Sequence, residues 1–489
     1  MTTPGSVGIV GAGVSGLVQA IQFRRAGVQD VVLYEREGDV GGTWLVNTYP
    51  GLHCDIPSHL YSYSFEPNPD WSHVYADRAE IQAYLRSCAE RYGLIDRIRF
   101  GTTVEQARYD EEAGVWELQL GDGNVARHRI LIGATGGLTA PRFPRIGGLD
   151  SFGGPLWHSA TWDHTVDLAG ARVAVVGSAA SAVQVVPAVA ERAAEVVVFS
   201  RTPNWVMPRN NRSYTDAERT AFRQEPATLD RVRREQYHRA LLWHRAFRRD
   251  QVAIDRLRQT GLDHMRRFID DRAVVAALTP DYDPGCRRIL VSDDYYRALA
   301  EPHVTLVPRG VERLTATSVV ADDGTDVAVD AVVFCTGYRL GGRADGTPAM
   351  ELVGRGGRRW VDVVAERAAA YRGVATPGFP NYFTVVGINA AVGYTAVFAS
   401  AEVCSEFITR VSAPVLAGHR KSVEARADAT LAYTDSIQAQ LADMSWTGNC
   451  TNFYRDAQGR VVTFYPGTVG QQRRELATIV EDDWISEGF

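Results

Sequence analysis

Three glycines near the N-terminus have the spacing that binds a pyrophosphate. Gly11, Gly13 and Gly16 form a G-x-G-x-x-G between an apolar segment and a helical pattern. In such a turn the first glycine permits the tight bend, the second lets the backbone approach a phosphate, and the third lets the helix pack on the strand. The helix N-terminus favours the negative charge. Glu35, at the end of the next apolar run, is placed to bind a ribose diol, so this unit predicts FAD or NAD.

A second unit of the same order begins near Arg172 and differs in its charge. Its turn keeps the first glycine, but Ala179 puts a methyl group where the backbone normally touches phosphate. Arg201, at the end of the following strand, suits the extra phosphate of NADP through a bidentate contact. The candidate NADP-binding residues lie in this turn or at this strand end: Gly177, Ser178, Ala179, Ser181, Ala182, Arg201 and Thr202.

These two repeats predict the elements that position the site. We expect an α/β fold with two Rossmann-like dinucleotide-binding domains, one for FAD and one for NADP. Residues 1–145 would form the first part of the FAD-binding domain, and residues 146–340 the NADP-binding domain. The charge-dense stretch at about 215–280 predicts a helical insertion in the NADP domain. Residues 341–489 would complete the FAD domain and form the C-terminal region.

Bulk composition narrows the class of protein. The formal net charge of −6 over 489 residues argues weakly against a nucleic-acid partner. No apolar run approaches the roughly 20 residues that cross a bilayer, and the first residues do not resemble a signal peptide. The six cysteines are scattered, with no Cys-x-x-Cys pair and no zinc spacing, so no metal is expected. This pattern predicts reduced thiols in a cytoplasmic protein, without the dithiol of a disulfide reductase.

The most specific motif follows the first unit. Phe152, Gly154, His158, Trp162 and Asp163 match F-x-G-x-x-x-H-x-x-x-W-D at each fixed position. The motif resembles the fingerprint of type I Baeyer–Villiger monooxygenases, within the flavin-containing monooxygenases (class B flavoprotein monooxygenases). The resemblance extends from Val7 to about Trp484. It implies that His158 couples the domains and does not act as an acid or base.

Further blocks are similar to the same family. They are Gly41-Gly42-Thr43-Trp44, Tyr49-Pro50-Gly51 with Asp55, and Gly285-Cys286-Arg287-Arg288-Ile289-Leu290. The resemblance implies that Arg287 binds the NADP phosphate, that Arg288 is the catalytic cation and that Asp55 holds Arg288. It also implies cofactor contacts for Thr43, Trp44, Asp55, Tyr61, Val104, Arg288 and Trp446.

The activity that the resemblance implies is the insertion of one oxygen atom next to a ketone carbonyl, which gives an ester or lactone. NADPH would reduce FAD, and the reduced flavin would form a C4a-peroxide with dioxygen, because side chains cannot activate dioxygen unaided. Arg288 could stabilise both the peroxide anion and the oxyanion of the adduct, since guanidinium stays protonated. The partners would be a small ketone and dioxygen.

Three other functions stay open from the sequence. An N- or S-oxygenating flavin monooxygenase would use the neutral hydroperoxide and would not need an Arg–Asp pair. A pyridine-nucleotide reductase of similar architecture would need a redox cysteine pair or a partner centre. A catalytically silent nucleotide-binding protein would keep the turns without turnover. The size of the ketone and the oligomeric state do not follow from these residues.

Overall fold

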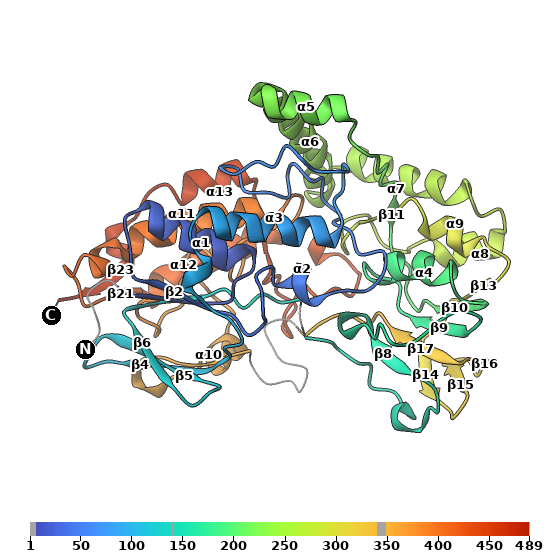
Figure 1. Ribbon diagram of the computed structural model, residues 1–489, viewed down its shortest axis with the longest axis horizontal. Coiled ribbons are helices and arrows are strands. Elements are labelled where there is room, and N and C mark those ends of the chain that lie inside the picture. Colours follow the sequence, from blue (N-terminus) through green and yellow to red (C-terminus); the bar gives the residue numbers. More distant parts are fainter. Residues whose placement is uncertain (1–5, 139, 340–348, 489) are drawn as a thin grey trace.

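The protein is described by a computed structural model that covers residues 6–138, 140–339 and 349–488. Two five-stranded parallel sheets lie at opposite ends of the molecule (Figure 1). The first has the order β19-β7-β1-β2-β3 and the second the order β13-β10-β9-β17-β8. In both, the strand that enters the glycine turn is central, as in dinucleotide-binding folds. The predicted fold class is therefore confirmed.

Short apolar runs build both sheets, because each is covered on its two faces. All four residues of β1, β7 and β17 are buried. The strands of the first sheet are β1 (Val7–Val10), β2 (Val31–Tyr34), β3 (Ile98–Arg99), β7 (Ile130–Gly133) and β19 (Tyr382–Thr384). Those of the second are β8 (Leu156–His158), β9 (Arg172–Val176), β10 (Glu195–Phe199), β13 (Val304–Val307) and β17 (Ala331–Phe334).

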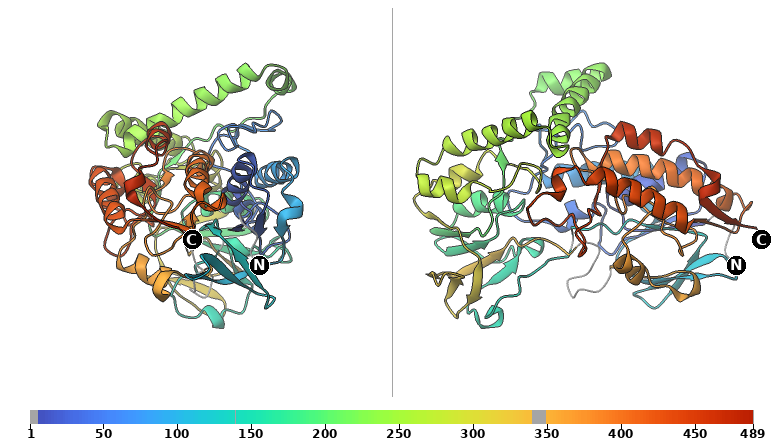
Figure 2. Two further views of the ribbon diagram at one scale, coloured as in Figure 1. Left: turned by 90° about the vertical axis from the view of Figure 1, so that its left-hand side faces the viewer. Right: turned by 180° about the vertical axis from the view of Figure 1, so that it is seen from behind.

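Residues after 349 return to the first sheet. Strand β19 pairs in parallel with β7, and helix α11 (Val397–Leu416) packs against α1 (Val14–Arg25). The two described ends of the chain lie on this same side of the molecule (Figures 1 and 2). Other helices of this half are α2 (Thr43–Val46), α3 (Arg78–Arg91), α10 (Trp360–Glu366), α12 (Ala427–Leu441) and α13 (Val469–Glu475).

Smaller sheets flank the two main ones. Strands β4 (Val104–Asp110), β5 (Val115–Leu120) and β6 (Val125–His128) are antiparallel, with β18 (Glu351–Val353) added beside β4. The second half carries the antiparallel strands β14 (Val311–Leu314), β15 (Ser318–Ala321) and β16 (Asp326–Ala328). Two-stranded pairs join β20 (Ala391–Val392) to β22 (Phe464–Tyr465), and β21 (Ser422–Ala425) to β23 (Trp484–Glu487).

A helical segment stands between two short paired strands, β11 (Val206–Met207) and β12 (Leu290–Val291). Its start is marked by Thr215, whose side chain forms a reciprocal capping box with Glu218. Asp250 and Asp271 cap two later helices. The segment rises above both sheets (Figures 1 and 2). Its helices are α5 (Asp216–Gln224), α6 (Pro226–Phe247), α7 (Gln251–Arg266) and α8 (Arg272–Leu278), and α9 (Tyr295–Leu299) follows β12.

The boundary expected at 340/341 lies outside the described residues. Within residues 6–138, 140–339 and 349–488, no helix combines the length and apolar character that a bilayer span requires.

Candidate active site

The first glycine turn leaves room for a phosphate at the start of α1. Gly11 has φ +105°, and a Cβ there would lie 2.4 Å from the Ala134 carbonyl oxygen. A Cβ on Gly16 would lie 1.9 Å from the Gly11 oxygen, so the helix can pack on the turn only without a side chain. Gly13 faces Gly42 and starts α1 without a side-chain cap. These residues fit the pyrophosphate of a dinucleotide.

Glu35 stands at the end of β2, as the sequence predicts. Its carboxylate accepts the backbone N–H of Ala12 at 2.8 Å and that of Glu37 at 3.0 Å. Burial raises the pKa of Glu35, against the effect of these two hydrogen bonds. The bonds fix the carboxylate beside the glycine turn. Val104 begins β4 and belongs to the buried cluster that also contains Tyr34.

Three of the remaining candidates in the first half, Thr43, Trp44 and Tyr61, lie close together. Thr43 is the first residue of α2, and Trp44 follows it. The Trp44 indole N–H donates to the Tyr61 hydroxyl at 3.0 Å. The Tyr61 ring meets Phe398 edge-on, with 4.8 Å between centroids. Thr43, Trp44 and Tyr61 therefore lie together, whereas Val104 lies in the cluster near the Glu35 end of β2.

The second turn keeps its shape with a single glycine. Gly177 has φ +133°, and a Cβ there would lie 2.4 Å from the Cys335 oxygen. The Ser178 hydroxyl donates to the Thr202 carbonyl at 2.6 Å, which joins the turn to the end of β10. Ala179 in the turn and Arg201 after β10 are both exposed. Helix α4 (Ala182–Ala190) begins directly after Ser181. An open turn next to an exposed arginine fits a phosphorylated nucleotide.

The long motif after residue 150 shapes the edge of the second sheet. A Cβ on Gly154 would lie 2.2 Å from the Asp330 oxygen, so only glycine fits there. Phe152 packs against the buried cluster of that sheet. Trp162 meets Trp157 edge-on at 5.5 Å between centroids, and the Asp163 carboxylate accepts the Thr165 N–H at 2.8 Å.

His158 ends strand β8 and is fully buried. Its Nδ1 accepts the Ala160 N–H at 3.0 Å, and its ring faces Phe143 and Tyr338 from the two chain crossings between the halves. Burial lowers the pKa of His158 to about 4, so the ring is neutral near pH 7. The ring is thus a buried, neutral group packed between the two chain crossings.

The Arg288 guanidinium and the Asp55 carboxylate form a bidentate pair. Nε donates to Oδ2 at 2.6 Å, and Nη2 donates to Oδ1 at 2.7 Å. The carboxylate raises the pKa of Arg288 above its usual value. The Arg288 side chain keeps 36% of its surface accessible and Asp55 keeps 25%. The guanidinium is thus a cation that the carboxylate holds in place and that remains partly accessible.

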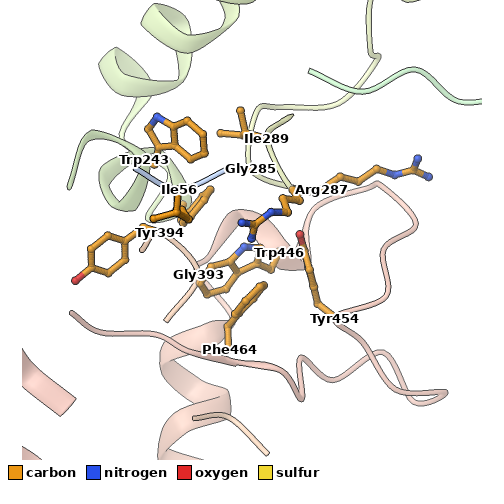
Figure 3. Close-up of a pocket in the computed structure, with 12 residues that line it drawn as sticks. Ile56, Trp243, Gly285, Arg287, Ile289, Gly393, Tyr394, Trp446, Tyr454 and Phe464 are labelled. Carbon is orange, nitrogen blue, oxygen red and sulfur yellow. The ribbon is translucent and has the colours of Figure 1, made fainter. Parts of the chain in front are cut away.

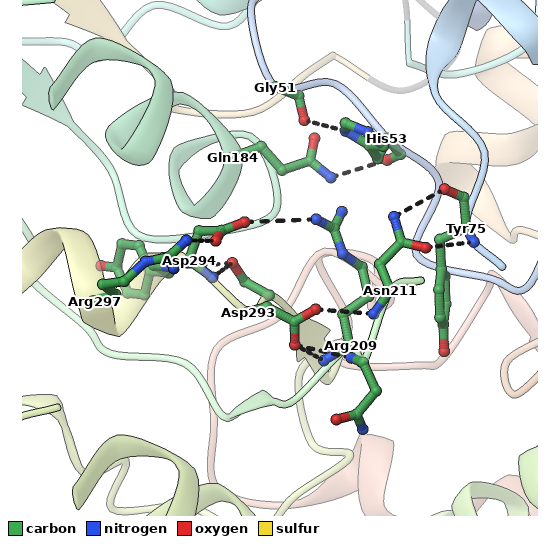
Figure 4. Close-up of polar contacts among 12 residues, drawn as sticks. Gly51, His53, Tyr75, Gln184, Arg209, Asn211, Asp293, Asp294 and Arg297 are labelled. Atoms are coloured by element: carbon green, nitrogen blue, oxygen red, sulfur yellow. Dashed lines mark hydrogen bonds and ion pairs between the residues drawn. The ribbon is translucent and has the colours of Figure 1, made fainter. Parts of the chain in front are cut away.

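Helix α4 determines where Asp55 lies. Gly51 has φ +78°, and a Cβ there would lie 2.5 Å from the Gln184 carbonyl oxygen. The Gln184 side-chain amide donates to the His53 oxygen at 2.9 Å (Figure 4). The Tyr49 hydroxyl donates to Gln184 Oε1 at 3.3 Å. The Tyr49–Asp55 segment therefore joins the two sheets, and Gln184 is a positioning residue that the motifs do not reveal.

A second polar contact locks the start of the helical segment (Figure 4). Asp293 accepts backbone N–H groups from Arg209, Asn210 and Asn211 at 2.9, 2.8 and 2.9 Å. The Asn211 side chain then bonds both backbone groups of Tyr75, at 2.9 and 3.2 Å. Asp293 follows the Arg287–Arg288 segment, so one carboxylate ties that segment to the first half.

Arg288 is one of the residues that line an aromatic pocket. Figure 3 shows Trp446, Tyr454 and Phe464 in this lining. Trp446 is 2% exposed, and its ring centroid lies 4.6 Å from that of Phe464 and 5.3 Å from that of Phe247. A Cβ on Gly393 would lie 2.5 Å from the Trp446 ring. The lining comes from five distant segments: Ile56, Trp243, Phe247, Gly285, Arg287, Arg288, Ile289, Gly393, Tyr394, Trp446, Tyr454 and Phe464. The sequence gives no signal for Tyr454, whose neighbours become apparent only in the fold.

The cysteines correct one expectation. Cys286 and Cys450 form a disulfide across 164 residues of sequence, so the prediction of six reduced thiols is wrong. Cys54, Cys88, Cys335 and Cys404 are free and buried. Pairing between distant cysteines depends on the fold and cannot be deduced from spacing. Because this cysteine pair exists, the lack of such a pair no longer argues against a pyridine-nucleotide reductase.

Known proteins match nearly the whole chain. The sequence profile of the flavin-binding monooxygenase-like family matches residues 5–220. A Baeyer–Villiger monooxygenase of Streptomyces coelicolor is 39% identical over 97% of this chain and 91% of its own length. One from Pseudomonas aeruginosa is 36% identical over 94% of this chain and 87% of its own.

Solved structures agree over the same extent. A steroid monooxygenase bound to NADP has a TM-score of 0.86 at 28% identity, with 99% of both chains covered. A cyclohexanone monooxygenase from Rhodococcus sp. Phi1 bound to NADP+ has a TM-score of 0.87 at 27% identity, with the same coverage. With two nucleotide turns, the Arg288–Asp55 pair and relatives of this identity and coverage, the chain belongs to the Baeyer–Villiger monooxygenases of the flavin-binding monooxygenase family.

Proposed function

We propose that the protein uses FAD, NADPH and dioxygen to insert one oxygen atom next to a ketone carbonyl, which gives an ester or lactone. One observation carries the proposal: Arg288, held by Asp55 in a bidentate pair, lines an aromatic pocket where the two nucleotide-binding halves meet. The family of its relatives supports the same reaction class.

The charged residue near each glycine turn would decide which cofactor binds there. Residues 1–145 and 341–489 would bind FAD through Gly11, Gly13 and Glu35, and residues 146–340 would bind NADPH. Arg201 and Arg287 would hold the 2′-phosphate, since guanidinium matches phosphate geometry. When bound, FAD reduced by NADPH supplies the dioxygen chemistry. The other cofactor contacts would come from Gly16, Thr43, Trp44, Asp55, Tyr61, Val104, Gly177, Ser178, Ala179, Ser181, Ala182, Thr202, Arg288 and Trp446.

The role of Arg288 follows from its charge and its fixed position. A carbonyl oxygen gains negative charge when its carbon is attacked, and a cation held beside it lowers the barrier by about 3 kcal/mol. Asp55 holds the guanidinium through two hydrogen bonds, so the cation need not reorganise during the reaction. Trp446, Phe464 and Phe247 exclude water, which strengthens this interaction.

The fingerprint residues would couple the halves and would not react. Phe152, Gly154, His158, Trp162 and Asp163 build the edge of the second sheet beside the chain crossings. His158 is neutral and buried, which supports this assignment. A cytoplasmic location stays a prediction that cell fractionation would test.

Product analysis with heavy dioxygen tests the reaction. The purified protein would receive FAD, NADPH and a panel of cyclic, aryl and linear ketones, a thioether and a tertiary amine. We expect a labelled ester or lactone that depends on NADPH. Labelled sulfoxide or N-oxide without any ester would instead support the N- or S-oxygenating alternative and overturn the ketone assignment.

A further inference from the structure

The Cys286–Cys450 disulfide joins the two sides of the pocket. Cys286 stands two residues before Arg288, in the segment that leads into β12 of the second half. Cys450 stands four residues after Trp446, in the C-terminal segment. Strand β22 of this segment pairs with β20, and its helix α13 packs against α11 of the first half. The two cysteines are 1% and 7% exposed. The bond therefore crosses between the halves directly behind the pocket.

Apolar packing and hydrogen bonds also cross at this place, and both cysteines belong to one buried cluster with Phe247, Met444 and Trp446. The Asn452 amide donates across the junction to the Cys286 carbonyl at 3.0 Å, and within its own segment to the Trp446 carbonyl at 3.0 Å. The Arg287 Nε–H donates to the Thr451 carbonyl at 2.7 Å. Such hydrogen bonds can exchange with water when two units move apart, and relative motion is the default between units joined by linkers. A covalent bond sets an upper limit on the separation that these contacts do not set.

We propose that Cys286 and Cys450 are positioning residues. Their disulfide, called the brace below, holds the segments of Trp446 and Arg288 at the same pocket. Its reduction allows the two halves to move apart at this junction. No other pair of cysteines is bonded among the described residues. The inference goes beyond the oxygen-insertion reaction, because the brace would act on the closure of the pocket whatever the substrate is.

The brace can be made and broken by ordinary thiol chemistry. On oxidation the two thiols lose two protons and two electrons to hydrogen peroxide, which becomes two molecules of water as the S–S bond forms. On reduction a small dithiol attacks one sulfur, is itself oxidised to a disulfide, and leaves two cysteine thiols. Both sulfurs are buried, so we expect reduction to be slow in the closed protein and faster when the halves separate.

Thiol counting tests whether the brace exists. The protein with its FAD would be denatured in an alkylating reagent, with or without prior reduction, and weighed by mass spectrometry. We expect four labelled cysteines without reduction and six after it. Six labelled cysteines without reduction would overturn the proposal, and peptide mapping must place the protected pair at Cys286 and Cys450.

Binding of NADP+ tests what the brace does. Binding would be followed by the change in flavin absorption, in oxidised protein, in reduced protein and in the C450A variant. We expect several-fold weaker binding in the last two with unchanged FAD content, and reoxidation with hydrogen peroxide should restore wild type but not C450A. C88A is the matched control, since Cys88 is also buried but lies in α3.

Equal NADP+ affinity in the oxidised and reduced wild-type protein would overturn the positioning role, even if C450A folds poorly. Neither the thiol count nor the binding measurement needs a ketone. A protein that makes no ester would therefore fail the proposed function without affecting this test.

Discussion

Asp55 and Arg288 are separated by 233 residues, yet their side chains meet through two hydrogen bonds of 2.6 and 2.7 Å. Asp55 follows a segment that packs on α4, and Arg288 precedes β12 of the second half. The pair therefore exists only when the two halves are docked. Catalysis by this cation should be sensitive both to the loss of charge and to the quality of the docking.

Arg288→Ala should abolish ester formation while FAD stays bound, because the cation at the carbonyl is lost and the FAD turn is untouched.

Asp55→Asn should lower kcat by about 10- to 100-fold, since one charge-assisted contact is weakened and the guanidinium becomes mobile. Product yield and flavin content measure both. Arg234→Ala, on the exposed face of α6, is the control. Retained ester formation in Arg288→Ala would refute the assignment.

Arg201→Ala should raise the KM for NADPH by about tenfold or more and leave the KM for NADH unchanged, because only NADPH carries the 2′-phosphate. Initial rates of cofactor oxidation with both nucleotides measure the ratio. Arg256→Ala, also exposed but in α7, should leave it unchanged. Equal losses with both cofactors would mean that Arg201 does not bind the phosphate.

Gly51→Ala should reduce kcat as well as stability. The new Cβ would lie 2.5 Å from the Gln184 oxygen, so α4 must move away from the Asp55 segment. Gly170→Ala is a matched control, because its φ of +74° resembles the +78° of Gly51 and nothing lies within 4 Å of its Cβ. The control should lose only about 1 kcal/mol of unfolding free energy, from backbone strain. If both variants lose activity equally, the helix contact is not responsible.

The protein should lose stability as the pH falls from about 6.5 toward 4. The pKa of His158 is lowered to about 4 by burial, so the unfolded chain binds the proton first and stability rises with pH in this window. Its contribution is present above pH 6.5 and is on the order of 1–2 kcal/mol smaller at pH 5. Three other buried histidines have the same shift: His59, His128 and His244.

Urea midpoints at pH 7 and pH 5 measure this loss. His158→Asn keeps an acceptor for the Ala160 N–H and removes the titration, so its midpoint should change less between the two pH values. A variant that loses as much as the wild type would show that His158 does not contribute.

Local sequence determined the repeated units and their glycine turns. Gly11, Gly16 and Gly177 occupy positions where a side chain would strike a carbonyl oxygen, so their types already indicate tight turns. Alternation of apolar strands with helices predicts the two parallel sheets, because each such strand must be covered on both faces. Glu35 and Arg201 each follow the next strand after a glycine turn, and this short spacing allows their positions to be predicted from the sequence.

Only the tertiary structure decided which distant segments meet. Gln184 contacts the Asp55 segment from helix α4 of the second half, Tyr454 enters the pocket from the C-terminal region, and Cys286 pairs with Cys450 across 164 residues. Nothing in the local sequence marks these partners, because contacts between distant segments depend on how the halves pack. The turns were readable because their geometry is local, whereas the pocket and its disulfide arise where two separately encoded halves dock.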